Sequence, residues 1–213
     1  MRKIKVVVCD DHQVVLEGLR LILEKTDAIE VADVFQDPKA LVSFLNQAPT
    51  PPDVVIIDAH LGNNENGLDI RNQVPNAKLY KWVLFSSYVD KYLAFQAEKF
   101  GFYACLSKEV PARVLTSVLL NTNHDQFVCY PEIPSDEKLK RRMEIVYESI
   151  QSLTKRESEV LQVLLSGVSS KECANRMHIS VYTFETHKKN IFRKLEINSS
   201  NELMRIAIDF NIK

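Results

Sequence analysis

Five polar side chains in this sequence could together carry out chemistry on a phosphoryl group. They are the carboxylates of Asp10, Asp11 and Asp58, the hydroxyl of Ser86 and the ammonium of Lys108. Clustered carboxylates repel one another unless a cation lies among them, and Mg²⁺ is commonly held by one or two carboxylates together with water and phosphate oxygens. An aspartate nucleophile, Mg²⁺, a hydroxyl and a lysine suit phosphoryl transfer, in which charge on three oxygens must be neutralised.

These residues stand at the ends of predicted β-strands. Five apolar stretches predict strands, at 5–9, 29–35, 54–58, 82–85 and 103–106. Apolar residues at helical spacing predict the intervening helices, at 15–23, 38–46, 91–100 and 111–120. This alternation predicts an α/β doubly wound fold with a five-stranded parallel sheet. The carboxyl ends of parallel strands meet at one edge of a sheet, so we expect the five polar side chains to converge there.

Each of these residues also has an ordinary structural explanation when taken alone. The aspartates could form turns, Ser86 could cap a helix, and Lys108 could be a solvated charge. Their occurrence at the ends of four different strands favours a site over these alternatives.

Length and composition indicate a globular protein of two domains. The chain has 213 residues, of which 46% are hydrophobic and 26% charged. No apolar run approaches the roughly 18 residues of a membrane span, and a strand rather than a signal peptide follows Met1, so we expect a cytoplasmic protein without a membrane partner. The four cysteines are scattered without CxxC spacing, which predicts neither zinc nor a disulfide framework.

Residues 153–213 predict a small all-α domain of four helices. Three pairs of a hydroxyl residue and a glutamate three positions later predict capping boxes at helix starts: Thr154 with Glu157, Ser169 with Glu172, and Ser199 with Glu202. Ser180 can cap a fourth helix. The short turn at 178–180 between two helices predicts a helix-turn-helix, whose second helix, 181–195, would enter a DNA groove.

The helix at 181–195 separates an apolar face from a polar one. Three residues would face the core: Phe184, Ile191 and Leu195. The polar side chains lie opposite or at the flank: Tyr182, Glu185, Thr186, Lys189 and Arg193. Lysine can bind guanine or phosphate, threonine a thymine methyl group, and glutamate the amino group of cytosine. From periodicity alone, an ordinary solvated face would be the better interpretation.

Residues 1–122 resemble the receiver domain of bacterial response regulators. The resemblance rests on the acidic pair after the first strand, the aspartate ending the third, the serine ending the fourth and the lysine after the fifth. It implies that a sensor histidine kinase phosphorylates Asp58, with Ser86 as the switch hydroxyl and Lys108 as the family's invariant lysine. It also implies that Mg²⁺ is held by Asp11, Asp58 and the backbone carbonyl of His60, with Asp10 acting through water. The His60 side chain would then have a structural or rate-tuning role.

The sequence departs from the receiver pattern in two places. The loop at 61–67, LGNNENG, is one residue longer than the usual spacing to its glycine and lacks the usual proline. Cys105 stands where the family commonly has a switch tyrosine or phenylalanine. An aromatic swing coupled to phosphorylation is therefore not expected, although Ser86 could still move.

The C-terminal residues resemble the LuxR-type DNA-binding domain. The matching segments are LTKRESEVL, Gly167, KECA and ISVYTFETHKKNIFRKL, with Phe184 in place of the more usual valine. The resemblance implies base contacts by Glu185, Thr186 and Lys189. It also implies phosphate contacts by three further residues: Thr154, Lys171 and Lys188. With the receiver, it identifies the chain as a member of the NarL/FixJ class of response regulators.

The remaining segments predict a linker and a dimer contact. Residues 123–152 are expected to be a linker containing a helix at 137–151, packed on a domain because it lacks the several heptads of a coiled coil. In the last helix, an inward stripe is predicted from three residues: Leu203, Ala207 and Phe210. Met204 and Ile208 fall on another face, through which LuxR-type domains commonly pair. Contact with the linker helix is the alternative for these two residues.

Together these observations predict a phosphorylation-controlled transcription factor that binds pseudo-palindromic double-stranded DNA as a homodimer. Its only expected reactions are self-phosphorylation and slow autodephosphorylation at Asp58. A true enzyme with an aspartyl-phosphate intermediate is disfavoured, because His60 stands where haloacid-dehalogenase-type hydrolases have a second aspartate. A regulator that binds DNA without phosphorylation, with the receiver as a dimerisation scaffold, stays open because of Cys105 and the loop at 61–67.

Overall fold

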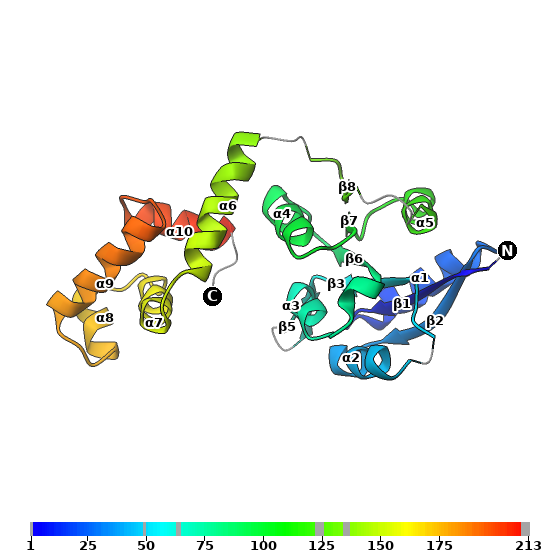
Figure 1. Cartoon of the computed structure of the whole chain (residues 1–213), viewed down its shortest axis with the longest axis horizontal. Coiled ribbons are helices and arrows are strands. Elements are labelled where there is room, and N and C mark those ends of the chain that lie inside the picture. Colours follow the sequence, from blue (N-terminus) through cyan, green and yellow to red (C-terminus); the bar gives the residue numbers. More distant parts are fainter. Residues whose placement is uncertain (1, 49, 63–64, 122–125, 134–136, 210–213) are drawn as a thin grey trace. The chain divides into compact units, whose positions relative to one another are not determined.

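The computed structural model describes residues 2–48, 50–62, 65–121, 126–133 and 137–209, except for the side chains of residues 139 and 209. The chain divides into two compact units, residues 1–134 and 135–213 (Figure 1). This division falls inside the predicted linker at 123–152. Residues 126–133 belong to the first unit and the linker helix to the second, which differs from the predicted boundaries at 122 and 152.

The first unit alternates strands and helices along the chain, and the predicted doubly wound α/β fold is confirmed. In chain order its elements are β1 (Ile4–Cys9), α1 (Gln13–Glu24), β2 (Ile29–Phe35), α2 (Pro38–Gln47), β3 (Val54–Asp58), β4 (His60–Leu61), β5 (Glu65–Asn66), α3 (Gly67–Asn72), a 3₁₀ helix (Ala77–Leu79), β6 (Lys81–Ser86), α4 (Lys91–Lys99), β7 (Ala104–Ser107), α5 (Ala112–Leu120) and β8 (Val128–Tyr130).

The main sheet has six parallel strands in the order β2-β1-β3-β6-β7-β8, one more than predicted. The additional strand is β8, which pairs with β7 inside the segment that the sequence assigned to the linker. A three-residue strand is too short to show a periodic pattern, and Pro131 directly after it suggested a break.

Helices cover both faces of the sheet, and the alternation of side chains along each strand divides the core between them. On β1, Val6 and Val8 pack in the cluster that contains apolar residues of α1 and α5. Val7 and Cys9 point the other way, into the cluster that contains residues of α2, α3 and α4. The strands are therefore apolar on both faces, as their continuous β-branched sequences predict.

A short hairpin accommodates the long loop after β3. Strands β4 and β5 pair in antiparallel fashion, and Asn66 then caps α3 by accepting a hydrogen bond from the backbone N–H of Leu68 at 3.0 Å. The backbone N–H of Gly67 donates to the carbonyl oxygen of Ala59 at 3.1 Å. A Cβ atom on Gly67 would overlap the backbone carbonyl oxygen of Asp58, so only glycine fits at this point.

In its described residues the second unit contains helices and no strands. Its helices are α6 (Glu137–Gln151), α7 (Lys155–Leu164), α8 (Ser170–Arg176), α9 (Val181–Lys194) and α10 (Ser200–Asp209). The last four are the predicted small domain, and α6 is the predicted linker helix. Among the described residues of either unit, no helix is long and apolar enough to cross a membrane.

Serine and threonine cap the helices as predicted, but only one of the three capping boxes is reciprocal. Thr154 and Glu157 each bond to the other's backbone N–H. Ser169 and Ser199 cap α8 and α10, whereas the glutamates three residues later bond elsewhere. Glu172 forms an ion pair with Arg176 at 3.3 Å. Glu202 of α10 accepts a hydrogen bond from the backbone N–H of Asn198.

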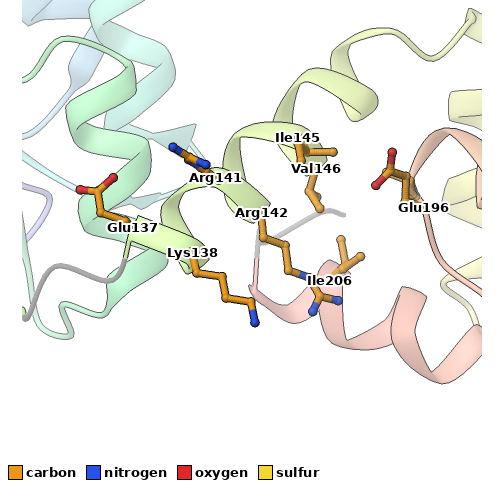
Figure 2. A pocket seen from close by; sticks show the side chains of 9 residues that line it. Glu137, Lys138, Arg141, Arg142, Ile145, Val146, Glu196 and Ile206 are labelled. Atoms are coloured by element: carbon orange, nitrogen blue, oxygen red, sulfur yellow. The ribbon is translucent and has the colours of Figure 1, made fainter.

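Helix α6 packs beside α9 and α10 of its own unit. Val146 is buried, and with Leu195 and Ile206 it lines a hollow of about 700 Å³ (Figure 2). Arg141 and Arg142 line the same hollow. Met143 of the same helix is also buried, so one side of α6 is covered.

We predict that Gly67→Ala destabilises the first unit, whereas Gly18→Ala stabilises it. Alanine at 67 must displace the Asp58 carbonyl and should lower the free energy of unfolding by about 1–3 kcal/mol. Gly18 lies inside α1 with open space around it, so alanine there should raise that free energy by about 0.5–1 kcal/mol. Urea unfolding followed by the fluorescence of Trp82, the single tryptophan, measures both. Equal effects of the two substitutions would contradict the close approach at Gly67.

Candidate functional site

A buried ion-pair cluster lies at the carboxyl edge of the sheet in the first unit. Asp10, directly after β1, is 1% exposed, and Asp58, the last residue of β3, is 3% exposed. Lys108 follows β7, and its Nζ lies 2.7 Å from Asp10 Oδ2 and 3.0 Å from Asp58 Oδ2. The backbone N–H of Lys108 also donates to the carbonyl oxygen of Ser86 at 2.7 Å. The ends of four strands are thereby brought together, as predicted.

Negative charge exceeds positive charge in this cluster. Burial raises the pKa of Asp58 and the neighbouring Asp10 raises it further, while the hydrogen bond and charge of Lys108 act to lower it. Burial acts to lower the pKa of Lys108, but its bonds to the two carboxylates outweigh this effect and the pKa is raised. The lysine is therefore held in its charged form between the carboxylates.

Lys108 Nζ lies 2.7 Å from Asp10 Oδ2, and His12 Nδ1 lies 2.8 Å from Asp11 Oδ1, so one ammonium and one imidazole face three carboxylates. Oxygen atoms of all three aspartates come within 4.8 Å of one another. Closely spaced carboxylate oxygens that carry more negative charge than one lysine balances are what a hard divalent cation such as Mg²⁺ binds, so these residues fit that ion.

His12 is a member of this cluster to which sequence reasoning gave no role. Its Nδ1 lies 2.8 Å from Asp11 Oδ1 and 3.2 Å from Asp10 Oδ1, and its backbone N–H donates to Asp10 at 2.9 Å. The sequence feature that could have pointed to His12 is its position directly after Asp10 and Asp11. The imidazole itself is largely exposed.

Ser86 and His60 adjoin the cluster in different ways. The Ser86 hydroxyl is buried and donates to the carbonyl oxygen of Tyr88 at 2.8 Å, and it accepts from the Tyr88 N–H. We find no hydrogen bond from it to Asp58 within the described parts of the chain. The backbone N–H of His60 donates to Asp58 Oδ1 at 3.3 Å, while the residue itself is exposed.

Comparison with known families identifies the first unit. The response regulator receiver domain family matches residues 6–120, which is more than half of the chain. The chain is a response regulator. Residues 151–207 match the luxR family of bacterial regulatory proteins, and this pair of domains fits the NarL/FixJ class. Both families describe regulators rather than catalytic enzymes.

Individual relatives span the whole response regulator. The response regulator protein VraR of Staphylococcus aureus is 26% identical over 210 residues, with 98% of each chain covered. VraR of Staphylococcus saprophyticus is 27% identical over 213 residues with the same coverage. RcsB of Salmonella enterica serovar Typhimurium, solved on the promoter P1flhDC with the phosphomimetic BeF3⁻, has a TM-score of 0.60 at 20% identity and covers 98% of this chain and 99% of its own.

In the luxR-type unit of the response regulator, α8 and α9 form the predicted helix-turn-helix. The turn depends on His178, which adopts a left-handed backbone with φ of 54°, and on the N–H of Ile179, which donates to the Ala174 carbonyl at 3.1 Å. Phe184 and Ile191 are completely buried. The apolar face of α9 is therefore the one predicted.

The opposite face of α9 is open to solvent. Five side chains predicted to read DNA belong to exposed residues: Tyr182, Glu185, Thr186, Lys189 and Arg193. Tyr182 is 85% exposed. The Thr186 hydroxyl donates to the Tyr182 carbonyl at 2.9 Å, which leaves its methyl group free to make contacts.

The three predicted phosphate contacts have different surroundings. Lys171 is exposed on α8. Lys188 is partly buried, with its ammonium 5.7 Å from the centre of the Phe192 ring and 3.9 Å from Glu185. Thr154 is exposed, but its hydroxyl already takes part in the capping box at α7.

An ion pair fixes the orientation of α9 on α7. Lys194, the last residue of α9, places its Nζ 2.7 Å from Glu157 Oε2 and 3.1 Å from the carbonyl oxygen of Ser152. The Lys194 hydrogen bond, together with bonds from Thr154, lowers the pKa of Glu157 to about 2. Sequence reasoning identified Glu157 only as a cap and gave Lys194 no role.

Helix α10 presents two apolar residues to solvent. Leu203 and Ala207 are buried, as predicted, together with Ile206, whereas Phe210 lies outside the described residues. Met204 is 39% and Ile208 77% exposed. Within the single chain, contact with the linker helix therefore does not cover Ile208.

We predict that Glu157→Gln destabilises the luxR-type unit by about 2 kcal/mol at pH 7, because a buried charged hydrogen bond is lost. The folded-state pKa of about 2 lies below the ordinary 4.5, so the carboxylate stabilises the fold above pH 4.5 and this contribution disappears as the pH falls toward 2. The difference between the wild type and this variant should shrink over the same range. Helix loss in urea, followed by circular dichroism at each pH, measures it.

Glu159→Gln is the matched control, because Glu159 forms an exposed ion pair with Arg156 on the same helix at 2.7 Å. This substitution should lower the free energy of unfolding by less than about 1 kcal/mol. Losses of equal size in the two variants would show that the Lys194 pair does not anchor the helix.

Proposed function

We propose that this response regulator is a cytoplasmic transcription factor of a two-component system, controlled by Mg²⁺-dependent phosphorylation of Asp58 by a sensor histidine kinase. The observation that carries the proposal is the position of Lys108, whose ammonium bridges Asp10 and Asp58 within a cluster of three carboxylates. All four cysteines are free thiols, in keeping with a reducing compartment.

Asp58 is the proposed nucleophile. Its carboxylate ends a strand whose other residues are buried, so it is held in place by the core, and one of its oxygens accepts the His60 N–H. Lys108 is already within hydrogen-bond distance of the other oxygen, where it can neutralise charge on an incoming phosphoryl group. Phosphorylation would attach a bulky dianionic phosphoryl group to one carboxylate oxygen, which gives Lys108 a new partner.

Asp11, Asp58 and the backbone carbonyl of His60 are the proposed Mg²⁺ ligands, with Asp10 acting through water. When bound, Mg²⁺ would supply the positive charge that the three carboxylates lack and would neutralise phosphate oxygens. Ser86 is the proposed switch residue. For its hydroxyl to bind the phosphoryl group, it must first release the carbonyl of Tyr88, and this release would move the loop that follows β6.

The proposed DNA interface is the exposed face of α9. Glu185, Thr186 and Lys189 would contact bases. Five residues would contact backbone phosphates or flank the groove: Thr154, Lys171, Tyr182, Lys188 and Arg193. Since RcsB has been solved on DNA with the same fold, the proposed mode of binding is compatible with this architecture. A homodimer paired through Met204 and Ile208 would place two α9 helices on a pseudo-palindrome.

We predict that a small phosphodonor with Mg²⁺ adds one phosphoryl group to the wild type, an increase of about 80 Da in intact mass. Asp58→Asn should remove the adduct, and chelation of Mg²⁺ should greatly slow its formation. Asp69→Asn, an exposed aspartate of α3, is the control and should still be phosphorylated. An adduct that persists in Asp58→Asn would overturn the assignment, and unchanged Trp82 fluorescence would show that the variant is folded.

A further prediction concerns the dimer face on DNA. Ile208→Asp should weaken binding to DNA with two half-sites by at least about tenfold, because pairing makes the second contact intramolecular, but should hardly affect one half-site. Lys189→Ala should weaken both and, if the lysine contacts phosphate, lower the salt slope by about 1. Fluorescence anisotropy on both DNAs, with and without phosphodonor, measures these effects.

Ile145→Asp is the control, since it places the same charge on a partly exposed apolar residue of α6. We expect two-half-site binding by this variant to match the wild type. Equal losses on both DNAs for Ile208→Asp, with helix content unchanged, would rule out α10 as the dimer helix. Binding that does not respond to the phosphodonor would favour a constitutive regulator with the receiver as scaffold.

A further inference from the structure

Two cysteines are neighbours on the last two strands of the receiver sheet. Cys105 of β7 is in register with Cys129 of β8, and residues in register on adjacent parallel strands point to the same face. Both belong to the apolar cluster on the face covered by α2, α3 and α4. Adjacent strands lie about 4.7–4.9 Å apart, which falls within the range of about 4.4–6.8 Å between Cα atoms of disulfide-bonded residues.

The two thiols differ in exposure. Cys105 has no exposed surface, whereas Cys129 is partly exposed and its Sγ lies 3.5 Å from the carbonyl oxygen of Pro131. A small oxidant can therefore reach Cys129 first. A hydrogen bond between the thiols lowers the pKa of Cys129, and the same bond together with burial raises that of Cys105. The more accessible sulfur is thus also the better nucleophile.

We propose that Cys105 and Cys129 form a reversible disulfide when the protein meets a hydroperoxide, which ties β8 covalently to β7. Neither residue belongs to the phosphoacceptor cluster or the DNA-binding face. The bond would restrain the chain at the point where it leaves the receiver sheet. The inference does not depend on the proposed function, because it concerns the chemistry of the two thiols.

The reaction balances with hydrogen peroxide as the oxidant. The Cys129 thiol gives up its proton and its sulfur attacks one peroxide oxygen. The O–O bond breaks, Cys129 becomes a sulfenic acid, and the other oxygen leaves as hydroxide, which takes up that proton to form water. Cys105 then loses its proton and attacks the Cys129 sulfur. The S–S bond forms, the S–O bond breaks, and hydroxide takes up the proton and leaves as water. The thiols give up two electrons, and the peroxide becomes two water molecules.

Such a disulfide should be easy to reduce again. Cys129 is partly exposed, so a thiol reductant can reach its sulfur in the disulfide. Exposed disulfides have more oxidising potentials and are the labile ones. A thiol reductant such as dithiothreitol should therefore restore both free cysteines.

The test uses the full chain in native buffer. After treatment with hydrogen peroxide, free thiols are alkylated and the protein is digested with trypsin without reduction. Trypsin separates the two cysteines because Lys108 and Arg113 lie between them. We expect one pair of linked peptides containing Cys105 and Cys129, and its disappearance after dithiothreitol. Folding holds the sulfurs together, so the link should form at least about tenfold faster in native buffer than in denaturant.

Two variants and a control sharpen the test. In Cys129→Ser, Cys105 should stay reduced at peroxide doses that fully link the wild type. In Cys105→Ser, Cys129 should proceed to sulfinic acid, because no partner captures its sulfenic acid. Cys173→Ser changes a buried cysteine of α8 in the other unit and should leave the link unaffected. Trp82 fluorescence shows that each receiver remains folded.

Two results would overturn the proposal. One is a folded wild type in which Cys129 becomes sulfinic acid while Cys105 can still be alkylated. The other is a link that forms no faster in native buffer than in denaturant.

Discussion

The carboxyl edge of the receiver sheet depends on a single ammonium group. Lys108 lies between two buried carboxylates, and its backbone joins the end of β7 to the end of β6. Removing one partner of such a buried cluster costs about 3–5 kcal/mol, because uncompensated charge remains in a region of low dielectric. Even with Lys108 present, three aspartates lie around one ammonium group, so negative charge remains in excess. The fold therefore tolerates a local electrostatic cost at the place where a cation and a phosphate would relieve it.

An ion pair also joins two elements of the small helical unit. Val160 of α7 and Phe184 and Ile191 of α9 are buried, and a polar contact adds to this apolar packing. The bond from Lys194 to Glu157 joins the end of one helix to the start of the other, and the same carboxylate also completes the cap at Thr154. One carboxylate thus sets both where α7 begins and how α9 is presented to solvent.

The sequence was sufficient to predict the elements with strong periodicity and the residues at their ends. Buried β-branched stretches gave the first five strands of the main sheet, and the acidic pair, Asp58 and Lys108 came together as expected. It missed β8, which is too short for a pattern, and the β4–β5 hairpin. The ion pair of Lys194 and the contacts of His12 join residues that local spacing does not relate. The Ser86 hydroxyl bond to Tyr88 depends on loop geometry that no pattern encodes.

The sixth strand also has a consequence for solubility. All four residues of β7 are buried, and β8 covers the side of that strand that would otherwise offer free backbone N–H and carbonyl groups. An uncovered apolar strand is a template for pairing with another chain. Because β8 has only three residues and Pro131 follows, it offers little further edge of its own. Loss of this short strand would therefore expose the edge of β7 to pairing with another chain.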